Sequence, residues 1–235
     1  MHKLSSFALG AICVVSSACS LDAPVGGRTF PQVRLVNAAP ATAGLTPAVT
    51  AHLNQSTNAM APSISYPGQT DGCPLILSAT HEIAFEQNGT TLAATTNRYD
   101  LDGRYTVVVT NTGTQYRALQ LSDRDAVAVG NNGLRFINAT STAGDVYVTP
   151  PGVAPSAAYK VRSNLAPLAT TTEVPPYVQR PETDIRIRLY DVGDTSTPRS
   201  DVTLGQLFAS KLATIVFIPS TGASDPGGFQ VNPCN

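Results

Sequence analysis

Hydrophobic residues recur at the two-residue period of a β-strand in many short runs, most of which end near Pro, Gly or Asn. In Ile185–Tyr190 the aliphatic side chains fall on one face and two arginines on the other, which is typical of a half-buried strand. Asn88-Gly89 indicates a hairpin turn between His81–Glu86 and Thr90–Ala94. One helix is predicted, over Leu204–Leu212, where four apolar residues repeat at helical spacing.

The strand pattern occurs twice along the chain. Val33–Pro40 and Leu134–Ser141 share the order apolar-Arg-apolar-apolar-Asn-Ala at a spacing of 101 residues, and their alternation predicts half-buried strands. Tyr105–Thr110 and Ala213–Ile218 form a second matching pair at a spacing of 108. Two similar offsets indicate a tandem duplication, and we interpret the polar segment Ser122–Gly133 as the linker between the copies.

These patterns predict an all-β chain with two tandem Ig-like β-sandwich domains, over residues 31–125 and 131–235. A length of 235 residues is enough for two small cores. Lys and Arg number 15 against 16 Asp and Glu, and this balance argues against nucleic acid as a partner. Charged residues make up only 13%, which we attribute to strand faces solvated by hydroxyl groups more than by ions.

The N-terminus has the pattern of an export signal over residues 1–18. A short basic start precedes the apolar stretch Ser5–Val15, which is too short to cross a bilayer. Ala18 before Cys19 resembles the lipobox of bacterial lipoproteins, although Ser16 stands where that motif has an aliphatic residue. The resemblance implies lipidation of Cys19, a tether over residues 19–30 and, with Ser20 next, an outer-membrane location. Plain secretion after cleavage at Ala18 and a fortuitous apolar start are the alternatives.

Two cysteines, Cys73 and Cys234, remain in the mature chain besides Cys19. In an oxidising compartment they are expected to form a disulfide, with two free thiols as the alternative. No second close pair of Cys or His accompanies either residue, so we expect no metal site there.

Arg135–Ala139 followed by Asp145–Gly152 resembles the opening of the DUF4397 domain, and Gly103–Val109 resembles a later strand of that family. The resemblance spans most of residues 32–235 and is more degenerate in the first half, where Val49–Leu53 replaces the Asp-Val-Tyr-Val strand. It implies an exported bacterial protein, often built of tandem copies behind a lipoprotein signal. The family has no known function, so the resemblance supplies no catalytic residues.

The sequence contains few candidates for chemistry, and we expect no catalytic residues, no cofactor and no metal. His52 and His81 are interpreted as ordinary strand residues, because neither belongs to a catalytic or metal-binding motif. Asp100–Gly103 is interpreted as a turn, since calcium-loop spacing fails around it. The acidic loops Asp123–Asp125 and Asp191–Asp194 are weak alternatives for calcium.

The function predicted from these features is a non-enzymatic lipoprotein of the cell envelope, a structural or interaction module held to the membrane by its N-terminal lipid. An envelope protein or a surface polysaccharide is the expected partner. The alternatives are a glycan or small-ligand binder and, less favoured, an envelope hydrolase. Glycan binding requires exposed aromatic side chains, for which the candidates are Tyr66, Tyr116, Tyr159 and Tyr177. Arg34 and Arg135 are expected on a solvated strand face or in an ion pair at the domain boundary, with a shared ligand role as the alternative.

Overall fold

The computed structural model describes residues 28–40, 48–112, 115–124, 127–128, 130–168, 170, 176–181, 184–204, 212–219 and 227–234. Within these residues the first half contains β1 (Gln32–Asn37), β2 (Val49–Leu53), β3 (Ala59–Ile64), β4 (Gly68–Gln69), β5 (Thr80–Gln87), β6 (Thr90–Arg98), β7 (Arg104–Thr112) and β8 (Gln115–Ser122). The second half contains β9 (Asn131–Asn138), β10 (Gly144–Thr149), the 3-10 turn η1 (Ala157–Tyr159), β11 (Lys160–Leu165), β12 (Val178–Pro181), β13 (Ile185–Asp191), β14 (Ser200–Leu204), β15 (Leu212–Phe217) and β16 (Gly228–Val231). The predicted all-β fold is confirmed.

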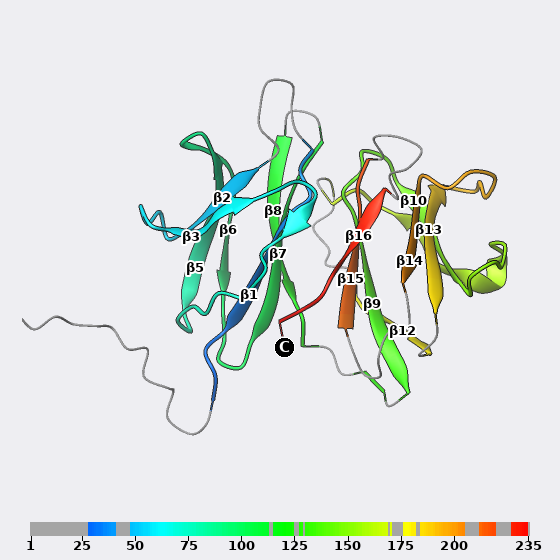
Figure 1. Cartoon of the computed structure of the whole chain (residues 1–235), viewed down its shortest axis with the longest axis horizontal. Coiled ribbons are helices and arrows are strands. Elements are labelled where there is room, and N and C mark those ends of the chain that lie inside the picture. Colours follow the sequence, from blue (N-terminus) through cyan, green and yellow to red (C-terminus); the bar gives the residue numbers. More distant parts are fainter. Residues whose placement is uncertain are drawn as a thin grey trace, which may run out of the picture.

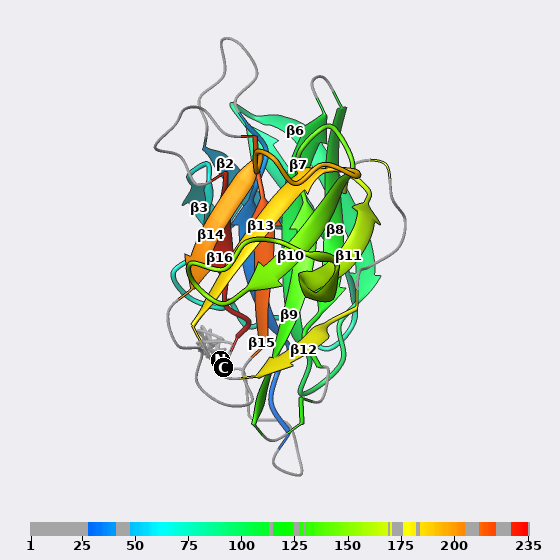
Figure 2. The ribbon, with the colours of Figure 1, turned by 90° about the vertical axis from the view of Figure 1, so that its right-hand side faces the viewer.

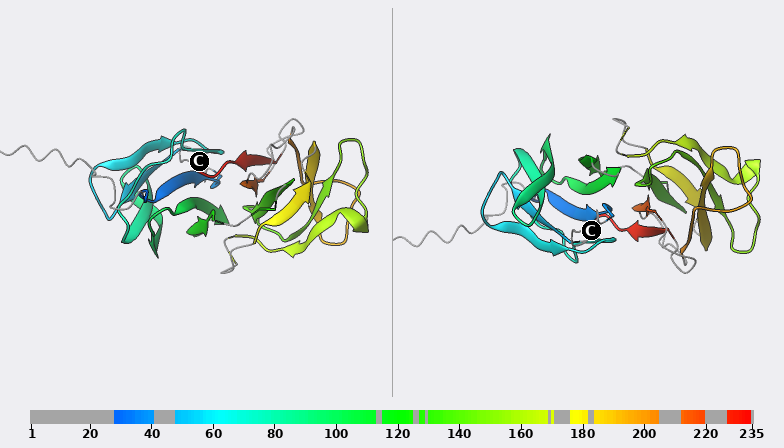
Figure 3. Two further views of the ribbon diagram at one scale, coloured as in Figure 1. Left: turned by 90° about the horizontal axis from the view of Figure 1, so that it is seen from below. Right: turned by 90° about the horizontal axis from the view of Figure 1, so that it is seen from above.

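The two halves have the same topology. Each has an inner sheet, ordered β4-β1-β7-β8 in the first half and β12-β9-β15-β16 in the second. Each also has an outer sheet, ordered β3-β2-β5-β6 and β11-β10-β13-β14. Every strand of the first half thus has its counterpart eight strands later, including the parallel pairs β1–β7 and β9–β15. The sheets stack as four layers in the order outer, inner, inner, outer (Figures 1 and 3). This order agrees with the tandem duplication inferred from the sequence.

Three hydrophobic cores fill the three spaces between the layers. The first core lies between the two sheets of the first half and the second core between those of the second half. The third core joins the halves through matching positions of the two inner sheets: Val36 with Ile137, Ala38 with Ala139, Val108 with Val216 and Leu121 with Val231 are counterparts in the repeat. The halves are therefore fused along a shared apolar face.

The third core corrects the expectation that β1 and β9 are half-buried. On β7, Val107 and Val109 point into the first core while Val108 points into the third, which explains its unbroken β-branched run. On β9, every residue from Asn132 to Asn138 is buried. The face that the alternating pattern assigned to solvent is covered by the other half.

The segment expected to be a linker, Ser122–Gly133, is also corrected in part. Residues 131–133 already belong to β9, where they pair with β12, and Asp123 is buried. Asp123 was expected in an acidic loop, but its carboxylate faces the second half. Asp123 is thus part of the junction between the halves.

Asp123 forms a buried ion pair with Arg135, as one of the expectations for Arg135 had it. Arg135 Nη1 donates to Asp123 Oδ1 at 3.1 Å, and the side chains are 2% and 0% exposed. Thr106 Oγ1 and Tyr177 OH donate to the same carboxylate at 2.7 and 2.9 Å, and the Arg135 guanidinium lies 3.9 Å from the centre of the Tyr177 ring. Burial raises the pKa of Asp123, and hydrogen bonds from Thr106, Arg135 and Tyr177 oppose the rise.

A disulfide closes the other side of the junction. After β16 the C-terminal segment turns toward the first half (Figure 1), and Cys234 Sγ lies 2.06 Å from Cys73 Sγ. The bond joins residues 161 positions apart. Together with the third core and the Asp123–Arg135 pair, it ties the two halves into one body.

Two local predictions from the sequence concern a hairpin turn and a helix. Asn88 and Gly89 have φ angles of 51° and 75° between β5 and β6, which confirms the hairpin turn. The predicted helix Leu204–Leu212 begins and ends on residues of β14 and β15, while residues 205–211 lie outside the described residues. Among the described residues no helix is long and apolar enough to cross a membrane.

Candidate functional site

The candidate site lies where β9 and β15 end, and it begins with an asparagine. Asn138 closes β9, and its Nδ2 donates to the carbonyl oxygens of Thr142 and Leu165 at 2.8 and 2.9 Å. Its Oδ1 accepts from the Thr140 amide at 3.0 Å and from the Thr140 hydroxyl at 2.6 Å. Asn37 Nδ2 binds Ile64 O in the same way in the first half, at 3.0 Å. Asn138 thus bonds the backbone where its strand ends and holds the loop after β9.

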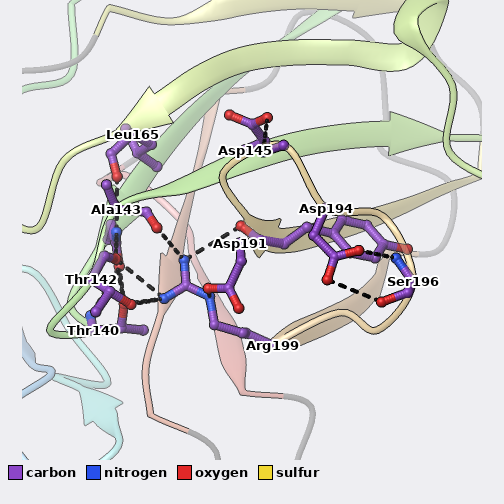
Figure 4. Close-up of polar contacts among 12 residues, drawn as sticks. Thr140, Thr142, Ala143, Asp145, Leu165, Asp191, Asp194, Ser196 and Arg199 are labelled. Atoms are coloured by element: carbon purple, nitrogen blue, oxygen red, sulfur yellow. Dashed lines mark hydrogen bonds and ion pairs between the residues drawn. The ribbon is translucent and has the colours of Figure 1, made fainter.

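Arg199, just before β14, reaches into that loop (Figure 4). Its Nη1 donates to Thr140 Oγ1 at 3.3 Å, to Thr142 O at 3.2 Å and to the Thr142 hydroxyl. Its Nη2 donates to Ala143 O at 2.7 Å, and its Nε lies 3.1 Å from Asp191 Oδ1. Burial lowers the pKa of Arg199, and Asp191 opposes the shift. The Arg199 guanidinium thus links the start of β14 to the loop after β9 and to Asp191 at the end of β13.

A glycine makes this approach possible. A Cβ placed on Gly144 would lie 2.3 Å from Arg199 Nη2 and 2.6 Å from Tyr190 O. Those distances are far below van der Waals contact, so a side chain at this position would push the guanidinium out of the loop.

Asp145, on β10, holds the β13–β14 loop and the neighbouring strand β11. Its carboxylate accepts from Lys160 Nζ at 2.6 Å, from the Asn164 amide at 2.8 Å and from the Gly193 amide at 3.2 Å. Desolvation alone would raise the pKa of Asp145, but the hydrogen bonds from these three groups outweigh it and the pKa is lowered. Because Gly193 belongs to the β13–β14 loop, Asp145 connects this loop to β10 and β11.

Next to Arg199 the surface has a pocket of about 400 Å³. Its wall combines hydroxyl groups, apolar side chains and the guanidinium, from Thr140, Ser141, Thr142, Pro198, Arg199, Ile218 and Pro219. The Arg199 guanidinium is already hydrogen-bonded to protein oxygens, so its role in the pocket is to hold the wall in place. Such a lining fits a small group that offers both hydrogen-bonding and apolar surface.

A family model described as "Domain of unknown function (DUF4397)" matches residues 31–149. The chain belongs to the DUF4397 family. The match covers the whole first half and continues through β9 and β10, so it ends earlier than the resemblance read from the sequence. The strand topology extends the repeat to β16, because the two halves have the same strand order.

A search of the curated proteins finds no match for this DUF4397 protein. Among solved structures, it is similar to one described as "Crystal structure of CBMbc (family CBM26) from Eubacterium rectale Amy13K in Complex with Maltoheptaose". The two are 11% identical, with 86% of this chain and 96% of that chain covered and a TM-score of 0.27. At this TM-score the likeness carries no inference about a ligand or a site.

The residues that carry the DUF4397 resemblance form the frame of the candidate site. Asn138 from the Asn-Ala pair caps β9, and Asp145 from the Asp-Val-Tyr-Val strand holds the β13–β14 loop. In the first half Thr50 takes the place of Asp145 in the strand register, so this acidic anchor belongs to the second half. The motif therefore builds the loop frame beside the pocket.

Of the sites predicted from the sequence, Cys19 lies outside the described residues, and Cys73 and Cys234 are joined as already described. His81 Nδ1 and Nε2 lie 2.8 and 2.9 Å from Asn54 Nδ2 and Leu77 O. His52 Nδ1 lies 2.8 Å from Ser56 O. Both histidines thus contact loop residues of the first half that lie next to its outer sheet.

The four tyrosines expected to be exposed are instead half-buried and scattered. Tyr66 packs against the third core and Tyr116 against the first. Tyr177 belongs to the Asp123 cluster, and burial strongly raises its pKa. Tyr159 lies at the end of η1. They therefore do not form a shared stacking platform for a sugar.

The acidic candidates for calcium have other roles. Gly103 N donates to Asp100 O at 3.0 Å, which confirms the turn, and Asp194 accepts from Ser196 N and Oγ at 2.8 and 3.0 Å. Within the described part of the chain no three metal-ligating side chains gather. Sequence reasoning missed Arg199, because 57 residues separate it from Thr142 and no local pattern links them.

Proposed function

We propose that this DUF4397 protein is a non-enzymatic interaction module of the bacterial cell envelope, held at the outer membrane by lipid on Cys19. Release as a secreted protein is the alternative for its location. The module would present the pocket beside Arg199 to a partner in the envelope. The proposal combines the N-terminal sequence pattern with the arrangement of the two halves.

The observation that carries the proposal is the placement of the two ends of the fold. Thr29 bonds Asp102 at the turn before β7, so the chain enters the fold where β1 and β7 begin. Figure 1 shows β1 and β9 rising from the same end of the molecule, and the pocket lies where β9 and β15 finish. A fused body with a tether at one end and a pocket at the other suits a protein that holds its contact surface away from a membrane.

The geometry of the polar groups supports binding over catalysis. In the pocket, the Arg199 donors are directed to protein oxygens, and the lining consists of hydroxyls and apolar groups. Both ring nitrogens of His81 contact protein groups of the first half, so the side chain has a structural role there. A pocket with this lining would take a sugar unit of a surface polysaccharide or a side chain of an envelope protein.

Photocrosslinking in intact cells tests the proposal. A photoreactive amino acid replaces Ser141, which is exposed at the pocket, and a control replaces Thr96, which is exposed on the outer face of β6. We expect a crosslinked partner from position 141 and none from position 96. Its digestion by protease or glycosidase assigns the class of partner.

A separate measurement tests the anchor. The intact mass of the protein extracted from cells should equal that of the chain from Cys19 onward plus lipid. An unmodified N-terminus at Cys19 contradicts the anchor and favours secretion, and equal crosslinking from both positions contradicts the pocket.

A further inference from the structure

Two neighbouring leucines project from the fold near the chain entry. Leu75 and Leu77 are 49% and 54% exposed, while Ile76 between them is buried in the first core. Among the described residues only one other large hydrophobic side chain, Val192, is exposed to this extent. The exposed apolar side chains therefore concentrate at Leu75 and Leu77, and we name them the leucine pair.

The leucine pair is held by the backbone on both sides. Leu75 forms a β-bridge with Gln32, and the Ile76 amide donates to Pro31 O at 3.1 Å. His81 Nε2 lies 2.9 Å from Leu77 O, and the disulfide fixes Cys73 at the start of the segment. With Ile76 anchored in the core, the leucine side chains cannot turn inward without breaking these contacts.

This pair lies at the end of the fold from which the tether leaves. Gln32 pairs with both Leu75 and Arg104, and the described chain begins only four residues earlier, at Arg28. Arg28 lies nine positions after Cys19, and a chain of that length spans at most about 30 Å. If Cys19 carries the lipid, the tether keeps the chain entry, and with it the leucine pair, close to the bilayer surface.

The charged residues around the pair suit a lipid surface. Among the described residues, Arg28, Arg98, Arg104 and Arg124 belong to this end, together with Asp100 and Asp102. Arginines at a membrane surface fit anionic headgroups. Exposed leucines with arginines beside them are the composition of an interfacial contact.

We propose that the leucine pair inserts into the headgroup region of the membrane that carries the anchor, and so sets the orientation of the whole body. This proposal rests on the anchored function proposed above. With the β1 end held down, the pocket beside Arg199 faces away from the bilayer. A second copy of the chain and a partner protein are the competing occupants of the pair.

The test uses the absence of tryptophan from the chain. Leu77→Trp gives a single-tryptophan protein with its probe in the pair, and Val192→Trp gives a matched control at an exposed position in the β13–β14 loop. The mature chain is coupled through its Cys19 thiol to a maleimide phospholipid, because its other cysteines form the disulfide. It is then bound to phosphatidylethanolamine–phosphatidylglycerol vesicles with and without brominated acyl chains.

We expect the Leu77→Trp emission to shift to the blue on vesicles and to lose most of its intensity with brominated lipid, while the Val192→Trp emission stays unchanged. Equal quenching of both, or of neither, overturns the proposal. A blue shift without vesicles that grows with protein concentration assigns the pair to self-association and also overturns it. Thermal melts check that both variants fold.

Chemical coupling keeps this result independent of the proposed function. The intact mass from cells decides whether Cys19 is lipidated in vivo, while the quenching decides whether the pair contacts lipid when the anchor is present. Leu75→Ser with Leu77→Ser, coupled in the same way, serves as a second variant. Without the leucine pair the body should lose its fixed orientation on the vesicle, so the accessibility of the pocket to a soluble labelling reagent should fall. An unchanged accessibility contradicts the role assigned to the pair.

Discussion

Replacing the buried arginine at the junction should lower the free energy of unfolding far more than replacing an exposed arginine. Arg135→Met keeps the apolar volume of the side chain but leaves the Asp123 carboxylate, which is 0% exposed, without its cation. Thr106 and Tyr177 would still donate to that carboxylate. Breaking a buried pair on one side costs about 3–5 kcal/mol. For a chain of this size, that loss corresponds to a fall in Tm of about 6–20 °C.

Urea and thermal unfolding of the full chain measure this effect. The matched control is Arg98→Met, because Arg98 and Asp100 form an exposed pair with side chains 68% and 52% accessible. Its expected cost is about 0–1 kcal/mol. Replacing both partners of the buried pair, by Arg135→Met with Asp123→Leu, should recover part of the stability, because no charge is then left without a partner.

The dependence on pH separates a lost charge pair from lost packing. Burial raises the pKa of Asp123, and without Arg135 that carboxyl should stay protonated to a higher pH in the folded state. A raised folded-state pKa makes the penalty largest at high pH and relieves it as the pH falls. The difference in the free energy of unfolding between Arg135→Met and wild type should therefore narrow from pH 8 to pH 5. A difference that stays constant with pH, or a loss of stability equal to that of Arg98→Met, refutes the reasoning.

Three further changes have defined outcomes. Cys234→Ser should lower stability by up to about 5 kcal/mol in the chain-entropy model, measured by unfolding against reduced wild type as the control. Gly144→Ala should cost about 1–3 kcal/mol, because its Cβ meets Arg199, whereas Gly72→Ala, with open space around its Cβ, should cost little. Since the pKa of Asp145 is lowered in the fold, wild-type stability should fall as the pH drops below about 4, and Asp145→Asn should flatten that fall in acid titrations.

The sequence was sufficient for the features that depend on neighbours along the chain. The period-two alternation places Ile187 and Leu189 in the second core, and the Asn88-Gly89 turn joins adjacent strands. The 101- and 108-residue spacings match the parallel pairs β1–β7 and β9–β15, in which Asn37 and Asn138 hold equal registers. These are local patterns, or comparisons of one local pattern with another.

What the sequence could not predict depends on contacts between distant surfaces. An alternating strand has one apolar face whether its other face meets water or a second sheet. The burial of Arg135 could therefore not be predicted from the residues of its own strand. The candidate site has the same difficulty. Asn138 bonds the loop that follows it in the sequence, while Arg199 comes from a strand end nearly 60 residues away.

The stacking of the halves also explains why so few residues are charged. Four sheets have eight faces, and the three cores cover six of them. Of the two remaining faces, the one on the second half (Figure 2) is itself partly covered: Tyr147 and Tyr190 are buried there, and Arg188 donates to Val153 O at 2.6 Å in the loop that crosses them. Charged side chains are stable mainly where water reaches them. A charged fraction of 13% therefore follows from the small area of sheet that faces solvent, and the hydroxyl-rich strands proposed from the sequence account for only part of it.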